Sequence, residues 1–523
     1  MSGLRFCRAG DRALLAYPPD GTGAETSARV RALDRSLQSR PFPGFVEAVP
    51  AVASLLVLYE PNEVSFAEIC AHLARADAEP AAAEGPGRLH VVPVAYGGLH
   101  GPDLAAVARV CGLAPEAFIA QHAAGEYRAL MLGFRPGFAY LGWLPEALRT
   151  SRQATPRVTV PAGSVAVAGL QTAVYPTASA GGWNLIGRTG AVLFDPLRDP
   201  PALVAPDDRV RFVPSTDAVA PNGENGDRAV LGAAIVEVLD GGVLTTVQDR
   251  GRSGFRRYGV GSAGVLDRMA ADAANAAVGN AGDAALLECT SGGPVLRFLA
   301  AARFAIAGAD LGATLERADL GEWRVPLATS VFARTGNVLR FGAPVRGCRA
   351  YIALGGGVDV PRRLGSRSTD LPGGYGGYDG RPLRAGDRLS LGWLAGVPGT
   401  TPLPDAADEV TVRVVLGPQD DHFAPETLGR FLASEWVVGL DSDRAGCRLT
   451  GPALEHAGPP EIESEGMVPG SVQVPPDGRP IVMLADGPTT GGYPKIATVV
   501  AGDVARLAQL VPGSGRVRFT VEG

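Results

Sequence analysis

Short runs of β-forming residues, separated by glycine and proline, recur along the sequence and limit the folds that this chain can adopt. In the first half they cluster between Arg157 and Phe212, as in VTVPAGSVAVAG, AVLFDP and RVRFVP. The second half repeats this texture in FAIAGADL, RAYIALGGG and VTVRVVLGP. The 70 glycines and 43 prolines among 523 residues place turns at close intervals, and such spacing predicts antiparallel barrels or sandwiches. We therefore expect a mainly β fold with α insertions.

Two segments of linker composition predict how the chain is divided. Pro214 to Arg228 is polar and rich in proline, glycine and asparagine, and Pro80 to Gly87 is a softer break. Before the softer break, Ser65 and Glu68 have capping-box spacing at the head of an amphipathic helix, and the apolar run Val52 to Leu58 predicts a strand. We predict a small α/β domain at 1–84, a β-barrel or sandwich at 85–213, a linker at 214–230, and further barrels or sandwiches at 231–403 and 404–523.

Helices are expected at four places among these strands. Pro102 lies near the start of one predicted helix and Gly112 just past its end, which is the usual asymmetry of these two residues. A short second helix follows from Pro115 to His122. In the second half, the pattern predicts helices from Asp267 to Val278 and from Gly502 to Leu510.

A short repeat relates the two halves. The sequence VPAGSV at 160–165 is echoed by VPGSV at 468–472, and the GGW at 181–183 is echoed by the GGY at 491–493. The two echoes occur in the same order along the chain. They therefore predict that the barrel of the first half and the last barrel of the second half are related.

Charge and apolar segments exclude several kinds of partner. The formal net charge of −6 gives no electrostatic reason to expect nucleic-acid or anionic-membrane binding. Charges interrupt the N-terminus before an apolar run develops, and Ala48 to Tyr59 is shorter than the roughly 20 residues that cross a bilayer. The six cysteines lie far apart, as in proteins with reduced thiols. We expect a cytoplasmic protein that binds neither nucleic acid nor membrane.

Common cofactor and catalytic motifs are missing from the sequence. There is no P-loop, no G-x-S-x-G elbow and no lysine in a biotin-attachment turn. The six histidines lack metal-ligand spacing, so we predict no protein metal site. A G-x-G-x-x-G occurs from Gly259 to Gly264, but the residues before it, Phe255 to Tyr258, are too basic for the buried strand of a dinucleotide site. A plain tight turn is favoured there.

The segment DGPTTGGYPK, from Asp486 to Lys495, is the best candidate for a ligand site. Lys495 is the only lysine among the 48 basic residues, and its compact ammonium group cannot be replaced by a guanidinium at every kind of site. Consecutive glycines allow a ligand to approach the backbone, while Thr489, Thr490 and Asp486 add polar groups. A β-turn stabilised by the aspartate and threonine side chains is the simpler alternative.

Three other segments supply further candidates: GFRPGFAYL at 133–141, with VPAGS and GGWNLIGRT downstream; QDRGR at 248–252; and SEG at 464–466 with GSVQ at 470–473. In the first of them, the alternating aromatic residues are also consistent with barrel core, and the arginines with structural ion pairs. The candidate catalytic residues are Lys495, Asp486 and Thr490. The candidate substrate- or nucleotide-binding residues are Ser464, Glu465, Gln473, Thr489, Gly491, Gly492, Tyr493, Arg135, Arg157, Ser164, Trp183, Gln248, Asp249 and Arg252.

These segments resemble two bacterial protein families. GFRPGFAYL, VPAGSVAVAG and GGWNLIGRT are similar to the B subunit of ATP-dependent 5-oxoprolinase, also called allophanate hydrolase subunit 1, over nearly all of 1–213. QDRGR, SRSTD and SEGMVPGSVQVPPDGRPIVMLADGPTTGGYPKIATV are similar to the C subunit, also called allophanate hydrolase subunit 2, over about 231–520. The chain thus resembles a fusion of the B and C subunits.

The resemblance implies cyclophilin-like β-barrels, one in the N-terminal half and two in the C-terminal half, beside the small α/β domain. It also implies ATP-dependent opening of the 5-oxoproline lactam to glutamate, with ADP and phosphate as products and Mg accompanying the ATP. Similar enzymes need a separate A subunit, a protein of the lactam-utilisation type. This chain is therefore expected to be inactive alone and to work in an oligomer.

The same resemblance leaves two alternatives. Relatives of both halves are described as a regulatory pair acting on a sensor histidine kinase, which implies binding without ATP turnover. Urea carboxylase shares these modules as its carboxyltransferase part, and that reading needs biotin carboxylase and carrier domains from other chains. Two positions depart from the family pattern: Ala180 replaces a proline before Gly-Gly-Trp, and Gly487-Pro488 replaces a longer polar pair.

Overall fold

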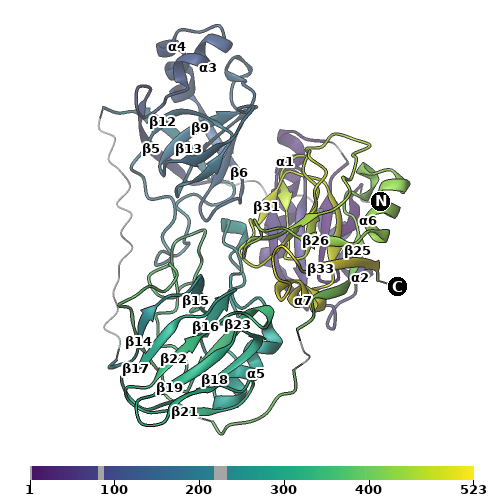
Figure 1. The fold of residues 1–523 in the computed structure, drawn as a ribbon. Helices are drawn as coiled ribbons and strands as arrows, with labels where there is room; N and C mark the ends of the chain where they lie inside the picture. The colour runs from purple at the N-terminus through teal and green to yellow at the C-terminus, as the bar shows by residue number, and fades with distance from the viewer. Residues whose placement is uncertain are drawn as a thin grey trace.

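The computed structural model describes residues 3–19, 21–79, 87–216, 232–394, 396–403 and 406–522. Most of both predicted breaks, Pro80 to Gly87 and the linker at 214–230, lies outside these residues, so the domain limits remain a prediction. The first barrel lies at one end and a two-sheet unit at the other, whereas the N-terminal unit packs beside the last barrel (Figure 1). The first and last parts of the chain are therefore neighbours in space.

The N-terminal unit is a four-stranded antiparallel sheet in the order β1-β2-β4-β3. Its side chains alternate between two faces, as the period of a strand requires. Leu14 and Val57 face the two helices, whereas Leu15 and Leu56 face the last barrel near Val468. The predicted capping box is confirmed, because the Ser65 hydroxyl accepts from the Glu68 N–H and the Glu68 carboxylate accepts from the Ser65 N–H. The elements are β1 Arg5–Arg8, β2 Ala13–Tyr17, α1 Ala24–Ser39, β3 Phe45–Pro50, β4 Leu55–Tyr59 and α2 Phe66–Ala78.

The first barrel closes in the order β10-β7-β6-β13-β5-β12-β9, and its first and last strands, β5 and β13, are parallel. Two short helices, α3 and α4, form the predicted helical insertion and lie at the outer end of the barrel (Figure 1). The strands are β5 Leu89–Tyr96, β6 Glu126–Leu132, β7 Ala139–Gly142, β9 Ser164–Ala168, β10 Gln171–Val174, β12 Asn184–Arg188 and β13 Arg209–Pro214. The insertion is α3 Leu104–Val110 and α4 Pro115–Ala124, and a side ribbon pairs β8 Arg157–Val160 with β11 Ser179–Gly181.

The last barrel closes in the order β25-β32-β29-β30-β27-β26-β33, again with its first and last strands parallel. When the strands of each barrel are numbered along the chain, the two cyclic orders are the same. The predicted relationship between these barrels is thus confirmed at the level of topology. The elements are β25 Glu409–Leu416, α6 Pro425–Ala433, β26 Trp436–Val438, β27 Gly446–Thr450, β29 Ser471–Gln473, β30 Ile481–Met483, β32 Lys495–Val499, α7 Val504–Ala508 and β33 Arg516–Val521, with a side ribbon of β28 Glu465–Gly466 and β31 Thr490–Gly491.

The unit between the barrels consists of two sheets around one apolar core rather than a closed ring. Helix α5, Arg268–Val278, presents a row of alanines to the five-stranded sheet, and small side chains allow this close packing. Asp267 caps the helix start and Gly279 ends it at a φ of +82°, as the sequence predicted. One sheet is β20 Gly321–Arg324, β19 Ala313–Arg317, β22 Val338–Phe341, β17 Val295–Phe298, β14 Ala234–Asp240 and β24 Arg388–Ser390; the other is β15 Leu244–Gln248, β16 Leu286–Thr290, β23 Arg346–Leu354, β18 Ala302–Asp310 and β21 Val331–Ala333.

The mainly β fold class is confirmed, and the two closed barrels have the cyclophilin-like character that was expected. Among the described residues, no single helix has the length and hydropathy needed to cross a membrane. Only α3 and α4 taken together, with a bend of 88° between them, pass that test.

Candidate functional site

A cavity of about 110 Å³ lies where the first barrel, the two-sheet unit and the last barrel meet. Its charged lining residues are Arg135, Asp370 and Asp486, and each comes from a different one of these three units. Gly259 and Gly261, from the G-x-G-x-x-G motif, form part of the wall. The motif follows the 3-10 turn Arg256–Tyr258 rather than a strand, which agrees with the tight turn favoured above.

Arg135 lies on the loop that follows β6. The loop is fixed to the last barrel, because the Phe134 N–H donates to Thr490 Oγ1 at 3.1 Å and a side chain at Gly133 would collide with Thr490. The Arg135 guanidinium lies 5.7 Å from the centre of the Phe134 ring. Burial lowers its pKa, and the carboxylates of Asp370 and Asp443 oppose that shift. Within the described residues this guanidinium has no hydrogen bond or ion pair to a protein group, so its donors are available to a ligand.

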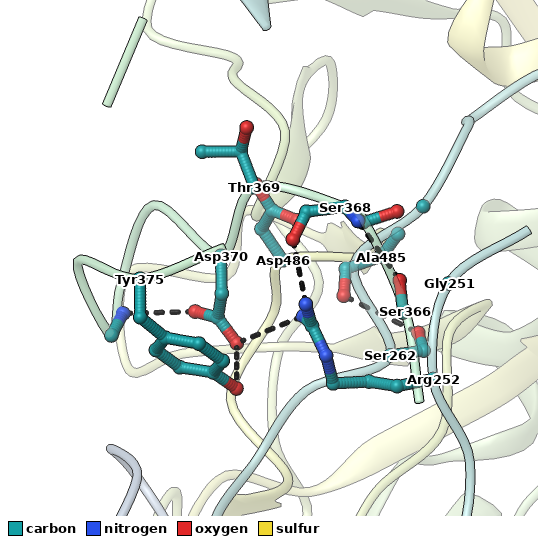
Figure 2. Close-up of polar contacts among 12 residues, drawn as sticks. Gly251, Arg252, Ser262, Ser366, Ser368, Thr369, Asp370, Tyr375, Ala485 and Asp486 are labelled. Atoms are coloured by element: carbon teal, nitrogen blue, oxygen red, sulfur yellow. Dashed lines mark hydrogen bonds and ion pairs between the residues drawn. The ribbon is translucent and has the colours of Figure 1, made fainter. Parts of the chain in front are cut away.

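Asp370 belongs to the SRSTD segment and lines the cavity, and its carboxylate takes part in a buried network with Arg252 and Tyr375 (Figure 2). Its Oδ2 accepts from the Tyr375 hydroxyl at 2.9 Å and lies 3.5 Å from Arg252, while its Oδ1 accepts from the Gly373 N–H at 2.8 Å. Burial raises the pKa of this carboxyl, and Arg252 opposes the shift. Asp370 is therefore a desolvated carboxyl held in one orientation.

Asp486 is held on the opposite side of the same region by Arg444. The guanidinium donates to both carboxylate oxygens, at 2.9 and 3.0 Å, and also pairs with Glu288 of β16. Burial raises the pKa of Asp486, Arg444 opposes this, and the nearby charge of Asp370 raises it further. Two carboxyls with raised pKa values thus face one cavity, an arrangement that suits proton transfer.

The QDRGR segment supports this site from outside the cavity. Asp249 accepts from the hydroxyls of Ser366 and Ser368, at 2.5 and 2.6 Å, and from the Arg367 N–H at 2.6 Å. Arg252 donates to the Ser368 carbonyl at 2.6 Å (Figure 2). Gln248 is buried as well and accepts from the Gly264 N–H. These three predicted residues hold the loop that carries Asp370 and do not line the cavity themselves.

Lys495 lies in a different cluster. Its ammonium group is 1% exposed and donates to Glu465 at 2.5 Å. Glu465 also accepts from the Tyr17 hydroxyl at 2.9 Å and from Gln419 at 2.7 Å. Tyr17 comes from the N-terminal unit, so this cluster joins the two ends of the chain. Lys495 is not among the residues that line the cavity, although it points into the protein rather than into solvent.

The other predicted residues of the last barrel's loop lie between the cavity and the cluster of Lys495 with Glu465. Thr490 accepts from the first barrel, as described, and the Thr489 hydroxyl is buried without a hydrogen-bond partner among the described residues. Gly491 leaves no room for a side chain beside Gln473, whose amide lies 3.5 Å from the Tyr493 carbonyl. Gly492 packs against Ser464. These residues shape the loop and do not line the cavity.

Three predicted residues are structural and do not line the cavity. Arg157 pairs with Asp103 at 2.7 Å, and the Ser164 hydroxyl donates to the Pro161 carbonyl at 2.7 Å within a turn. Trp183 packs edge-on against Phe138 in an apolar cluster that is separate from the inner core of the barrel. These three side chains therefore have structural roles, as the simpler explanation of this segment predicted. Of the arginines in the segment, Arg135 alone lines the cavity.

Sequence reasoning missed Asp370, Arg444 and Tyr17 as parts of these clusters. Asp370 ends the SRSTD segment, which carried part of the family resemblance, so that motif was a usable signal. Arg444 and Tyr17 sit in segments without a distinctive motif. Among the described residues, no group of three or more histidine, cysteine, aspartate or glutamate side chains could hold a metal ion.

Comparisons with known proteins agree with this architecture. A family model described as the carboxyltransferase domain, subdomain A and B, matches residues 258–521, and one for subdomain C and D matches residues 4–204. The chain is 38% identical over 289 residues to the C subunit of 5-oxoprolinase from Escherichia coli K12, covering 53% of this chain and 89% of that protein. It is 48% identical over 177 residues to the B subunit of 5-oxoprolinase from Escherichia coli O157:H7, covering 34% and 81%.

A solved structure matches almost the whole chain. The crystal structure of TTHA0988 superposes with a TM-score of 0.85 and 36% identity, covering 97% of this chain and 99% of that one. The joined arrangement of all these units in one chain therefore has a structural counterpart.

Proposed function

The chain belongs to the carboxyltransferase-domain family that includes the B and C subunits of 5-oxoprolinase, and on that premise we propose that it is a fused B/C component of the ATP-dependent enzyme. In this proposal it opens 5-oxoproline to glutamate together with a separate A subunit. Relatives named as the B and the C subunit of 5-oxoprolinase both match this one chain, which covers 81% and 89% of their respective lengths.

The observation that carries the proposal is the guanidinium of Arg135, which lines a small cavity together with Asp370 and Asp486 and makes no hydrogen bond or ion pair among the described residues. A planar guanidinium binds a carboxylate through two parallel hydrogen bonds. 5-Oxoproline carries one carboxylate on a compact ring. We assign Arg135 to that carboxylate, which would leave the lactam group near the two aspartates.

The size of the cavity indicates which substrate enters it. At about 110 Å³ it is far smaller than the roughly 300 Å³ at which pockets for larger organic ligands begin, so we assign to it the five-membered ring of 5-oxoproline rather than a nucleotide. We therefore place the binding of ATP and its Mg outside this cavity, with the A subunit as the proposed contributor.

The chemistry then follows from the lactam. Its carbonyl is a poor electrophile, and phosphorylation of the carbonyl oxygen by ATP activates it toward water. Addition of one water and cleavage of the C–N bond give a glutamyl phosphate, which a second water hydrolyses to glutamate and phosphate. The ring nitrogen must gain a proton as it leaves. Asp370 and Asp486, whose pKa values are raised by burial, are proposed to receive the proton of the attacking water and to supply that of the leaving nitrogen.

Among the predicted catalytic residues, Asp486 keeps this role in the proposal. Lys495 and Thr490 are proposed as positioning residues instead. Thr490 fixes the loop of Arg135, and the pair of Lys495 with Glu465 fixes the N-terminal unit against the last barrel.

The test is reconstitution with a cognate A subunit, ATP and 5-oxoproline, with glutamate as the readout. Glutamate is expected only when all components are present. Asp370→Asn is expected to lower kcat by about 10²–10⁴-fold, the usual contribution of a general acid or base. Asp319→Asn, at an exposed carboxylate of the same two-sheet unit, is the matched control and should leave kcat unchanged.

Two results would overturn the proposal. One is the absence of glutamate in the complete mixture, which the kinase-regulator and urea-carboxylase alternatives both predict. The other is normal turnover by Asp370→Asn with an unchanged circular dichroism spectrum, which would leave the family assignment but remove the assigned site.

A further inference from the structure

A second and larger cavity, of about 250 Å³, lies in the two-sheet unit. It opens between the end of β23, the turn after β24 and the loop at 359–367. Its chemically distinctive lining residues are Arg362, Arg367, Asp283, Asp359 and Trp393. None of these residues lines the first cavity.

The charged groups of this cavity pair only loosely with one another, although Arg367 also donates to the Val360 carbonyl at 2.9 Å and Arg362 to the Gly365 carbonyl at 3.4 Å. Arg362 lies 3.5 Å from Asp283, and Arg367 lies 3.5 Å from Asp359. Both separations exceed the 2.7–2.9 Å or so of a good charge-assisted hydrogen bond. By contrast, Arg381 of the same unit donates to both oxygens of Asp387 at 2.8 Å. The cavity therefore offers guanidinium donors and carboxylate acceptors that a ligand can engage.

Trp393 adds an aromatic surface at the rim. The residue is 92% exposed, whereas Trp183 and Trp436 are buried in apolar clusters. An indole ring attracts cations through its face and also packs against aliphatic groups. An exposed indole beside loosely paired charges is a feature of a binding surface rather than of a core.

The balance of charge selects the class of ligand. Two cations and two anions surround the cavity, so a simple anion would gain from the arginines and be repelled by the aspartates. A molecule that carries both signs can satisfy both pairs. The volume, slightly below the 300 Å³ or so of larger ligand pockets, matches a small molecule.

We propose that this cavity binds a free α-amino acid as its zwitterion. The carboxylate lies against Arg362 and Arg367, the ammonium group against Asp283 and Asp359, and the side chain along Trp393. The loop that supplies Arg367 continues to Asp370, and the Arg367 N–H donates to Asp249 beside the first cavity. The two cavities therefore lie at opposite ends of one loop.

Calorimetric titration of the intact chain with L-glutamate and with a panel of other L-amino acids, each taken separately, tests this proposal. Neither a second protein nor ATP is needed, so the outcome is independent of the proposed reaction. We expect saturable binding of at least one amino acid, and binding at least about tenfold weaker after its N-acetylation, which removes one charged hydrogen-bonding group. Titration with 5-oxoproline, which lacks an ammonium group, separates this site from the first cavity.

Variants at exposed positions locate the binding without threatening the fold. Arg362→Gln and Asp283→Asn, at side chains that are about half exposed, should each weaken binding about tenfold. Trp393→Ala should weaken it as well. Arg340→Gln, which removes an exposed ion pair with Glu316 elsewhere in the same unit, is the matched control and should not change it. The proposal is overturned if no amino acid binds saturably, if N-acetylation has no effect, or if Arg362→Gln and Asp283→Asn bind as the parent chain does.

Discussion

The first and last barrels share an arrangement of aromatic residues. They differ in the polar residues at one equivalent position. In each, an aromatic residue on the second strand donates to the carbonyl of the residue five positions earlier, Tyr127 to His122 and Trp436 to Phe431. That earlier residue lies on a helix and stacks on a phenylalanine of the last strand, His122 on Phe212 at 4.9 Å and Phe431 on Phe519 at 4.5 Å. The two barrels thus share one aromatic framework.

The polar position is built on equivalent backbone contacts. In the first barrel Asp103 accepts from the Leu185 N–H and from Arg157. In the last barrel Gln419 accepts from the Lys495 N–H and donates to Glu465. Arg157 and Glu465 occupy matching places, because each lies opposite the second-strand glycine of its side ribbon, Gly181 or Gly491.

The same position in the barrel framework has a different structural role in each barrel. The first barrel completes its ion pair from its own residues, and that pair stays partly exposed. The last barrel places a lysine where the first has Leu185, buries it, and needs both Glu465 and the Tyr17 hydroxyl of another unit. The same position is thus a local ion pair in one barrel and a contact between units in the other.

The largest expected effect comes from breaking the buried pair. Glu465→Gln leaves the Lys495 ammonium group buried without a carboxylate, and such a change costs about 3–5 kcal/mol of unfolding free energy. Chemical denaturation measures it. The double variant Glu465→Gln with Lys495→Met should recover part of the loss, because no unpaired charge remains. A loss below about 1 kcal/mol in the single variant would mean that the pair contributes little.

The second effect is a pH dependence of the unfolding free energy, which the aromatic framework of the first barrel should show because it contains a histidine. Burial lowers the pKa of His122 to about 3, so the folded first barrel does not bind the proton that the unfolded chain binds below about pH 6.5. The stability associated with neutral His122 is complete above that pH and is lost as the pH falls toward 3. Proton linkage at His122 predicts that the unfolding free energy falls by about 3 kcal/mol between pH 7 and pH 4.

His122→Phe tests this by giving the first barrel the residue type that the last barrel has in Phe431. The variant should lose less stability than the parent chain between pH 7 and pH 4, as followed by denaturation at each pH. Equal pH slopes would show that His122 is protonated in the folded protein or that its site is wet. Because the variant also loses hydrogen bonds to Tyr96 and Thr172, only the pH slope is diagnostic.

The smallest effect is expected at the position that matches Glu465. The Arg157 side chain is 32% exposed, and solvent screens its pair with Asp103. Arg157→Gln should therefore cost about 1 kcal/mol or less, measured under the same conditions as Glu465→Gln. A cost as large as that of Glu465→Gln would remove the distinction between a local pair and a contact between units.

Local features of this fold were predictable from the sequence. The capping box at Ser65, the helix after Asp267 and the echo between the two barrels depend on residues close together in the chain, where spacing decides geometry. The strand pattern of the two-sheet unit was compatible with a barrel or a sandwich, and the family resemblance implied a third barrel there. Closure of a ring depends on pairing between distant edges, which strand texture does not report.

The candidate site was only partly predictable for the same reason. Asp486 was selected from its glycine-rich loop, but its partner Arg444 and the facing Asp370 are recognised only once distant segments are brought together. Lys495 was selected as a site residue because it is the only lysine. Its actual partners include Tyr17, which is joined to Glu465 across 448 positions of sequence. No local pattern connects residues so far apart.

Binding of 5-oxoproline to Arg135→Gln, measured by calorimetry beside the parent chain, tests the central claim most directly. The account predicts that the parent chain binds and that the variant binds at least about tenfold more weakly, because a charged hydrogen-bonding partner of the carboxylate is lost. Arg149→Gln, at an exposed arginine of the same barrel, should bind as the parent does. Equal binding by Arg135→Gln, or no binding by the parent chain, would contradict the claim that the two halves build one carboxylate-binding cavity.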